Sequence, residues 1–294
     1  MKVQIMYKND ITFAISKVLE RLPAQKISDK FNVYRHQKIR QQLTPVFDEA
    51  YETFTRYDSH KVNDTIWIFW WQGEDSMPKV VQKCYRSIQQ NRGKKNIVLI
   101  TQDNIKQYTD IPKFIYDKLD KGVITYTHFS DIVRANLIKN NGGLWMDATL
   151  YVTSSLDNID LKKLFYCSGY PADTFNVSFG RWTGFFMGGP SGMELFSFMD
   201  RLYEVYWRDH EKLLDYFLID YGLDYAWKKD LSSFKSLEES YKQNNPHLFD
   251  LQGMLNQPYD DKEWKRITSN TSVFKLSYKK KIDFDKKESY YNKL

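Results

Sequence analysis

The chain has 294 residues, of which 42% are hydrophobic and 16% aromatic, so it can bury a large core and is not globally disordered. Its formal net charge of +6 comes from 43 basic and 37 acidic residues. This mild and evenly spread excess argues against a dedicated nucleic-acid binder, so nucleic acid is not an expected partner. One basic run, residues 278–287, predicts a solvated tail, with contact to an anionic membrane surface as the alternative.

Cysteine usage and hydropathy indicate where the protein works. Cys84 and Cys167 are far apart and neither belongs to a CxxC pair, so we predict no zinc site and no disulfide framework, and we expect a reducing compartment. The apolar stretches of the N-terminus are interrupted by Lys8, Asn9 and Asp10, which makes it a poor signal peptide. No apolar run approaches the ~20 residues that cross a membrane. We therefore expect a cytoplasmic protein, with peripheral attachment at the inner face of the membrane left open.

The first 60 residues or so predict helices. Residues 11–22 carry apolar side chains at helical spacing, and residues 45–57 form a second helical pattern with Pro45 in its first turn. Neither pattern carries an obvious chemical constellation. We interpret residues 1–62 as an N-terminal helical region, either an arm or an accessory subdomain.

Strands and helices alternate from residue 65 onward. Residues 65–71 (TIWIFWW) and 96–101 are continuous apolar runs, as expected for strands covered on both faces. The helices predicted between and after these runs, and the third strand, cover residues 77–91, 112–122, 128–143 and 144–152. This order indicates an α/β fold built on a parallel sheet.

Ligands of such sheets bind beyond the carboxyl ends of the strands. Residues 70–73, residues 101–104 and Asp147 all fall at those ends, so we expect them along one edge of the sheet. The chain has no GxGxxG after the first strand and no GxxxxGK[ST] anywhere. Dinucleotide oxidoreductases and P-loop enzymes are therefore disfavoured.

A polar pair opens the predicted helix 128–143. Ser130 is placed to cap the helix, Asp131 then lies in the first turn, and Arg134 is three residues on, on the same face as Asp131. The plain interpretation is an i,i+3 ion pair with a capping role. The functional interpretation is a carboxylate and a guanidinium positioned for a polyhydroxyl ligand.

Asp147 interrupts the apolar run GGLWMDATL, near the end of the third predicted strand. An acid is costly to bury unpaired. A carboxylate at this place can coordinate a hard divalent cation or accept hydrogen bonds from sugar hydroxyls. By the two-residue period of a strand, Thr149 is expected on the same side as Asp147.

Together these residues form a recognisable segment. Residues 129–150, FSDIVRANLIKNNGGLWMDATL, resemble the conserved segment of the capsular polysaccharide synthesis glycosyltransferases, which belong with the family 32-like, DXD-type transferases. Residues 66–88 are similar to that family's opening strand and first helix, and residues 274–279 to its closing segment. The positions that match the family pattern are Ser130, Asp131, Arg134, Gly142, Gly143, Trp145, Asp147 and Thr149.

The resemblance implies a GT-A fold, a Rossmann-like domain that binds a nucleotide sugar, here over residues 63–280 with a basic C-terminal tail at 281–294. It also implies roles at the donor site. Asp131 and Arg134, next to Ser130, would hold the hydroxyls of the donor hexose. Asp147, the first acid of the DXD motif, would be the catalytic residue, contacting ribose or sugar and reaching the metal.

The remaining donor contacts are implied in the same way. Trp70 or Trp71 would stack on the nucleobase, and core or rim packing is the equal alternative for either ring. Gln72 would shape the turn beneath the base. Lys275 would neutralise the diphosphate, against the alternative of a solvated lysine.

The family's second acid is replaced by Thr149, so the metal is the weakest part of the resemblance. We expect Mn²⁺ or Mg²⁺ on Asp147, with Asn256 or Asp260 as a further ligand and a plain turn as their alternative role. His128 and His247 are the candidate general bases, with structural roles as the alternative.

The resemblance implies retaining transfer of a hexose, galactose or glucose, from a UDP-sugar to a saccharide or lipid-linked oligosaccharide acceptor in bacterial capsular or surface polysaccharide synthesis. The alternatives are a transferase that modifies a protein acceptor, and a non-enzymatic module that binds sugar or a partner through a degenerate metal site.

Overall fold

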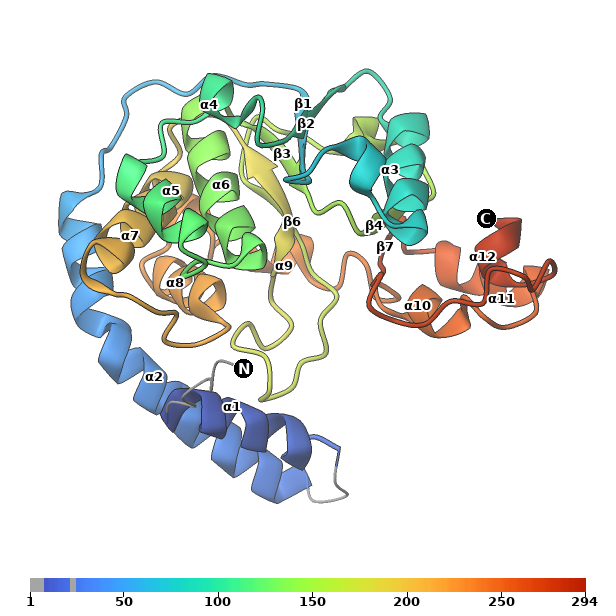
Figure 1. The fold of residues 1–294 in the computed structure, drawn as a ribbon, viewed down its shortest axis with the longest axis horizontal. Helices are drawn as coiled ribbons and strands as arrows, with labels where there is room; N and C mark the ends of the chain where they lie inside the picture. The colour runs from blue at the N-terminus through green and yellow to red at the C-terminus, as the bar shows by residue number, and fades with distance from the viewer. Residues whose placement is uncertain (1–7, 22–24) are drawn as a thin grey trace.

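The computed structural model describes residues 8–21 and 25–294. A central sheet of five strands has the spatial order β2-β1-β3-β6-β5. Strands β1, β2, β3 and β6 of this sheet are labelled in Figure 1. Strand β1 pairs in parallel with β2 and β3, whereas β6 runs antiparallel to β3 and to β5. The strands are β1 Thr65–Phe69, β2 Asn96–Ile100, β3 Gly143–Met146, β5 Phe165–Cys167 and β6 Thr183–Gly189. The predicted α/β fold is confirmed, and the sheet is mixed rather than wholly parallel.

Helices cover both faces of this sheet because its strand residues alternate between two apolar cores. Trp67 and Trp145 belong to the core beneath α6 and α7, whereas Ile66 and Leu144 belong to the core beneath α3. The helices are α3 Lys79–Asn91, α4 Ile105–Tyr108, α5 Lys113–Asp120, α6 Tyr126–Asn141, α7 Glu194–Asp209, α8 Leu218–Lys228, α9 Glu238–Tyr241, α10 Asp250–Met254, α11 Asp261–Thr268 and α12 Tyr290–Lys293, with short 3₁₀ turns at Glu74–Ser76, Leu156–Asn158 and Leu231–Ser233.

The N-terminal region is helical, as predicted, and its second helix is longer than expected. Helix α1 spans Lys8–Leu19 and α2 spans Gln25–Thr53, so Pro45 lies inside α2 rather than in a first turn. An internal proline costs about 3 kcal/mol. Burial of Leu43 and Phe47, at roughly 1.5–3 kcal/mol each, offsets this cost where α2 packs on α7. Residues 1–7 and 22–24 of the predicted region lie outside the described residues.

The C-terminal segment packs against the outer side of α3. A second sheet pairs β4, Leu150–Val152, with β7, Val273–Lys275, and α10 to α12 gather beside it (Figure 1). In the run 278–287, expected to be a solvated tail, Ile282 is buried in this cluster, and so are Tyr290 and Tyr291 further along the C-terminal tail 281–294. The basic run is thus exposed only in part, because its aromatic and apolar neighbours hold it to the domain.

No helix in residues 8–21 and 25–294 is both long enough and apolar enough to cross a membrane.

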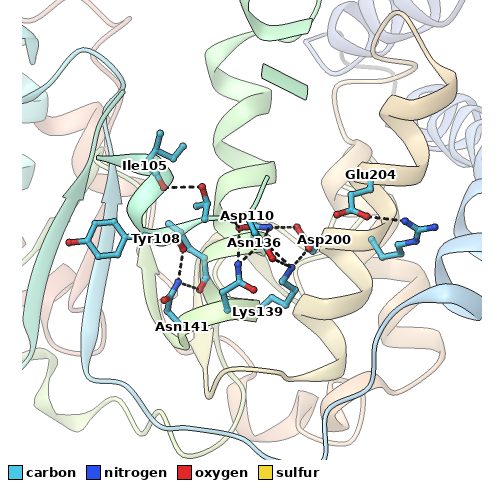
Figure 2. Close-up of polar contacts among 12 residues, drawn as sticks. Ile105, Tyr108, Asp110, Asn136, Lys139, Asn141, Asp200 and Glu204 are labelled. Atoms are coloured by element: carbon cyan, nitrogen blue, oxygen red, sulfur yellow. Dashed lines mark hydrogen bonds and ion pairs between the residues drawn. The ribbon is translucent and has the colours of Figure 1, made fainter. Parts of the chain in front are cut away.

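A partly buried polar network joins α6 to α7 and to the segment after α4 (Figure 2). Asn136 donates to Asp110 Oδ1 at 2.6 Å and to Asp200 Oδ1 at 2.9 Å, and Lys139 Nζ lies 2.6 Å from Asp200 Oδ2. Asn140 donates to the same Asp110 oxygen at 2.7 Å. Burial raises the pKa of Asp200 against the opposing charge of Lys139. The network fixes the C-terminal half of α6, whereas Asp131 lies in the N-terminal half and Arg134 at the middle of the helix.

Replacing Asp200 by alanine is expected to destabilise the fold by about 3 kcal/mol or more, because it leaves a largely buried ammonium group on Lys139 without its closest carboxylate. Glu204→Gln on the same helix is the matched control. Its partner Arg201 is partly exposed, so the control should lose less than about 1 kcal/mol of unfolding free energy. Denaturant unfolding measures both. Equal losses would mean that the network does not hold α6.

Candidate functional site

Helix α6 begins earlier than the sequence pattern indicated. Its cap is Thr125, whose side chain accepts a hydrogen bond of 3.2 Å from the His128 amide. The prediction that Ser130 caps this helix is wrong, because Thr125 satisfies the capping rule first. Ser130 instead donates to the Thr127 carbonyl at 2.6 Å, and Asp131 lies in the second turn.

The turn from α6 into β3 needs its two glycines. Gly142 and Gly143 have φ values of 67° and 106°, in the left-handed half of backbone space. A Cβ on Gly143 would lie 2.5 Å from Trp67 Nε1, which donates to the Gly142 carbonyl at 2.7 Å. This close approach aligns β3 with β1. It sets Asp147, the residue after β3, at the same edge of the sheet as the end of β1.

Asp147 is paired on both carboxylate oxygens. Oδ1 accepts from Trp145 Nε1 at 2.9 Å and lies 3.2 Å from Arg134 Nη2, and Oδ2 lies 2.6 Å from Lys275 Nζ. Burial alone would raise the pKa of Asp147, but the charges of Lys275 and Arg134 outweigh burial and hold that pKa below its usual value. The acid in the apolar run is therefore ionised and holds two cationic groups.

Arg134 is the hub of the cluster. Its Nη2 lies 3.1 Å from Asp131 Oδ1, Nη1 donates to the Gly184 carbonyl on β6, and the guanidinium sits 5.0 Å from the Trp145 ring centroid. The residue is only 5% exposed. One guanidinium therefore ties α6, β3 and β6 together, and it links Asp131 to Asp147 in a single chain of charges.

A cavity of about 190 Å³ lies over this chain of charges. The structure brings together five of the donor-site residues predicted from the sequence, since all of them line this cavity: Ser130, Asp131, Arg134, Asp147 and Lys275. The other lining residues are Thr125, Thr127, His128, Tyr170, Gly184, Phe185, Leu213, Tyr216, Phe217, Ile219 and Asp220. We call this space the charged cavity.

His128 has a structural role at the wall of the charged cavity. Its Nε2 accepts from Trp207 Nε1 at 3.0 Å, so the ring proton belongs on Nδ1, which lies 3.5 Å from Asp131 Oδ2. His247 instead bonds Asp250 at 2.7 Å and does not line the cavity. Of these two candidate general bases, His128 already uses its Nε2 to bond Trp207, and His247 lies outside the charged cavity.

The two tryptophans predicted to stack on the nucleobase lie at the same edge of the sheet as Asp147. Trp70 and Trp71 follow β1 directly and are half-buried. Trp70 donates to Ser76 Oγ at 2.9 Å, and Trp71 stacks on Tyr126 with ring centroids 5.8 Å apart. Gln72 is exposed next to them.

Three residues expected near a metal do not join the cluster. Strand β3 ends at Met146 and a turn follows, so the two-residue period does not extend to Thr149, which does not line the charged cavity. Asn256 donates to the Lys281 carbonyl at 3.0 Å and accepts from the Asp283 amide at 2.8 Å. Asp260 caps α11. Within residues 8–21 and 25–294, no group of three or more His, Cys, Asp or Glu side chains is arranged to hold a metal.

Sequence reasoning missed Asp220, on α8. Burial and the nearby negative charge of Asp131 raise the pKa of Asp220 to about 7. Tyr170 and Tyr216 line the same cavity. Residues 218–228 form a Tyr-containing amphipathic helix with two acids, Asp220 and Asp224, and neither belongs to a motif. Only the folded chain, which buries Asp220 near Asp131, distinguishes it. A carboxyl that titrates near neutral pH is suited to accept a proton.

The fold and site therefore define an α/β protein with a paired-charge cavity at the carboxyl edge of its sheet. A profile of the family described as "Capsular polysaccharide synthesis protein" matches residues 20–294, and the chain belongs to this family. The predicted resemblance is thus confirmed. The solved structures that are similar to the chain include "PaToxG Glycosyltransferase", at 14% identity and a TM-score of 0.44 over 80% of this chain and 94% of that one. No curated protein matches.

Proposed function

We propose that the chain is a retaining glycosyltransferase that moves glucose or galactose from a UDP-sugar to a saccharide or lipid-linked oligosaccharide during synthesis of a bacterial capsular or surface polysaccharide. The observation that carries this proposal is the run Asp131–Arg134–Asp147–Lys275, ion-paired throughout and lining one cavity at the sheet edge where α/β proteins bind ligands. Membership in the family supports the same function.

The size of the charged cavity limits what it holds. At about 190 Å³ it is smaller than the roughly 300–1,000 Å³ of pockets that enclose whole ligands. In our proposal it takes only the hexose, whose hydroxyls bond Asp131 and Arg134. The nucleobase lies outside this cavity, against Trp70 or Trp71. The diphosphate lies between the hexose and the nucleobase, near Lys275.

The transfer breaks the bond from the anomeric carbon to the diphosphate oxygen and forms a bond to the oxygen of an acceptor hydroxyl. Positive charge develops on the sugar ring, as in glycoside hydrolysis, and Asp131 and Asp147 supply negative charge beside it. The departing diphosphate gains negative charge near Lys275. Asp220, once ionised, takes the hydroxyl proton and passes it to solvent.

A divalent cation is the part of the proposal that the donor set supports least. Both oxygens of Asp147 are already bonded, so a cation would have to displace Lys275 or bind the same Asp147 oxygen as Lys275 does. The Mn²⁺ or Mg²⁺ expected from the resemblance stays a prediction, and UDP-sugar binding and hydrolysis measured with the ion and with EDTA test it.

The test is binding and turnover of nucleotide sugars by the full chain. UDP-glucose or UDP-galactose at 100 times its dissociation constant should stabilise the fold by about 2.7 kcal/mol, or roughly 5 °C in Tm. Slow release of UDP should follow without acceptor. ADP-glucose and GDP-mannose are the comparison donors. If no nucleotide sugar raises Tm or is hydrolysed, with or without metal, the proposed function is wrong.

A further inference from the structure

A second cavity, of about 420 Å³, adjoins the charged cavity through a shared wall residue, Tyr170. Its walls come from the segment between β5 and β6 and from the segment around α9 and α10. It is lined by Gly169, Tyr170, Pro171, Ala172, Phe179, Gly180, Arg181, Glu238, Lys242, Gln243, Pro246, Phe249 and Asp250. We call this space the outer groove.

Aromatic rings run from the charged cavity into the outer groove. Phe185 lines the charged cavity, with Lys275 Nζ 4.3 Å from its ring centroid. It contacts Tyr170 edge to face at 5.8 Å, and Tyr170 lies 5.1 Å from Phe249 at an interplanar angle of 34°. The two spaces therefore share one aromatic wall, and Tyr170 and Phe249 face the outer groove.

The polar groups of the outer groove balance in charge. Arg181 and Lys242 are basic, Glu238 and Asp250 are acidic, and these two and two sum to zero. Arg181 is already bonded to Asp224, at 3.0 Å. A diphosphate or a polyanion needs excess positive charge, which this groove lacks. Rings with polar groups around them instead suit a neutral polyhydroxyl ligand, stacked by its apolar face.

The backbone of the outer groove is strained. Phe179 and Gln243 have φ values of 50° and 49°, and both line the groove. They are two of five non-glycine residues with positive φ in the described parts of the chain. Such conformations are unfavourable and cluster at ligand sites. Phe179 also remains 38% exposed although it is a large apolar residue.

The loop that carries Tyr170 and Phe179 is held by the N-terminal helix α2. Thr174 donates to Asp29 at 2.6 Å, and its carbonyl lies 3.0 Å from His36 Nε2. Asp29 and His36 both belong to α2, so this helix anchors the loop. A pre-anchored loop loses less entropy when a ligand binds.

We propose that the outer groove is the acceptor site, and that it binds a neutral saccharide of two or more sugar units by stacking on Tyr170 and Phe249. This inference rests on the proposed function. The groove is larger than the charged cavity, so it has room for more than one ring. The shared wall at Tyr170 is where the acceptor's terminal hydroxyl enters the charged cavity.

The experiment separates the acceptor from the donor. Saturation-transfer NMR with lactose, maltose, maltotriose and an anionic heparin disaccharide measures saccharide binding to the full chain, and calorimetry measures UDP-glucose binding. We expect signals from at least one neutral glycan and none from the anionic one. Phe249→Ala should weaken saccharide binding about tenfold through loss of stacking.

A second variant and a control guard against misfolding. Ala172→Trp fills the exposed rim of the outer groove and should abolish the saccharide signal. Asn158→Trp makes the same kind of change in an unrelated cavity of about 440 Å³ and should leave the signal intact. The inference is overturned if wild type binds no neutral glycan, or if both groove variants bind as wild type does. If wild type binds a neutral glycan but neither binds nor hydrolyses any nucleotide sugar, the proposed function is wrong and the outer groove is a sugar-binding site only.

Discussion

Replacing Asp147 by asparagine is expected to reduce UDP-sugar hydrolysis and hexose transfer at least about 100-fold. Asparagine can still accept a hydrogen bond from Trp145, but it carries no charge for Lys275 and Arg134, which lie 2.6 Å and 3.2 Å from the carboxylate. Both cationic groups would then reorient, and misplacement by about 1 Å is enough for such a loss. The measurement is UDP release with and without acceptor.

The same variant should also be less stable at neutral pH. The pKa of Asp147 is lower in the fold than its ordinary value of 3.8, so its stabilising contribution is present above pH 3.8 and is lost as the pH falls through the folded pKa. The difference in Tm between wild type and Asp147→Asn should therefore be full at pH 7 and shrink below about pH 4.

Asp261→Asn is the matched control for Asp147. Asp261 is exposed on α11, pairs with Lys265 at 2.6 Å and is not among the residues that line the charged cavity. A surface pair of this kind contributes less than about 1 kcal/mol. Normal activity in Asp147→Asn would remove that residue from the donor site, whatever the control does.

The sequence alone predicts those parts of the site in which an apolar strand or helix pattern ends at a recognisable motif. The strands β1 and β2 and the helix α3 lie where the apolar runs indicated, and the parallel pairing of β1 with β3 follows from that alternation. Because parallel strands end at one edge, this order was enough to expect Trp70 and Asp147 near each other.

What the sequence does not reveal has physical causes. Residues 144–152 form one apolar run, yet β3 and β4 belong to two sheets with Asp147 and a turn between them. Buried strands of either sheet look alike in sequence, so the break is invisible. The antiparallel pairing of β6 likewise depends on long-range contacts. Asp220 carries no motif, and its pKa is raised only when the fold buries it on α8 and brings it near Asp131.

Replacing Asp220 by asparagine is expected to stabilise the fold and to remove activity at the same time. Burial raises the pKa of this carboxyl from 3.8 to about 7. A raised carboxyl pKa means that the folded state binds the proton more tightly, so stability falls as the pH rises from about 4 to 7. At pH 8 the buried, ionised Asp220 destabilises the fold, and asparagine does not. We expect the free energy of unfolding of Asp220→Asn to exceed that of wild type by about 2 kcal/mol, a value that already allows for contact of Asp220 with cavity water.

Activity should move in the opposite direction. If Asp220 accepts the hydroxyl proton, the transfer rate of wild type rises with pH around 7, and Asp220→Asn loses about 10²- to 10⁴-fold with a flat profile. UDP-sugar binding should survive, because Asp131, Arg134 and Lys275 remain. The measurements are Tm at pH 4, 6 and 8 and the transfer rate over the same range.

Asp224, one turn further along α8, supplies a control of opposite sign. Its carboxylate lies within 3.0 Å of atoms of Arg40, Arg181 and Lys228, and although burial opposes them, these charges lower its pKa. Asp224→Asn should therefore lose about 3 kcal/mol at pH 8, where Asp220→Asn gains. If both variants lose stability at pH 8, Asp220 is a paired structural acid like its neighbour, and the proton must leave the acceptor by another group.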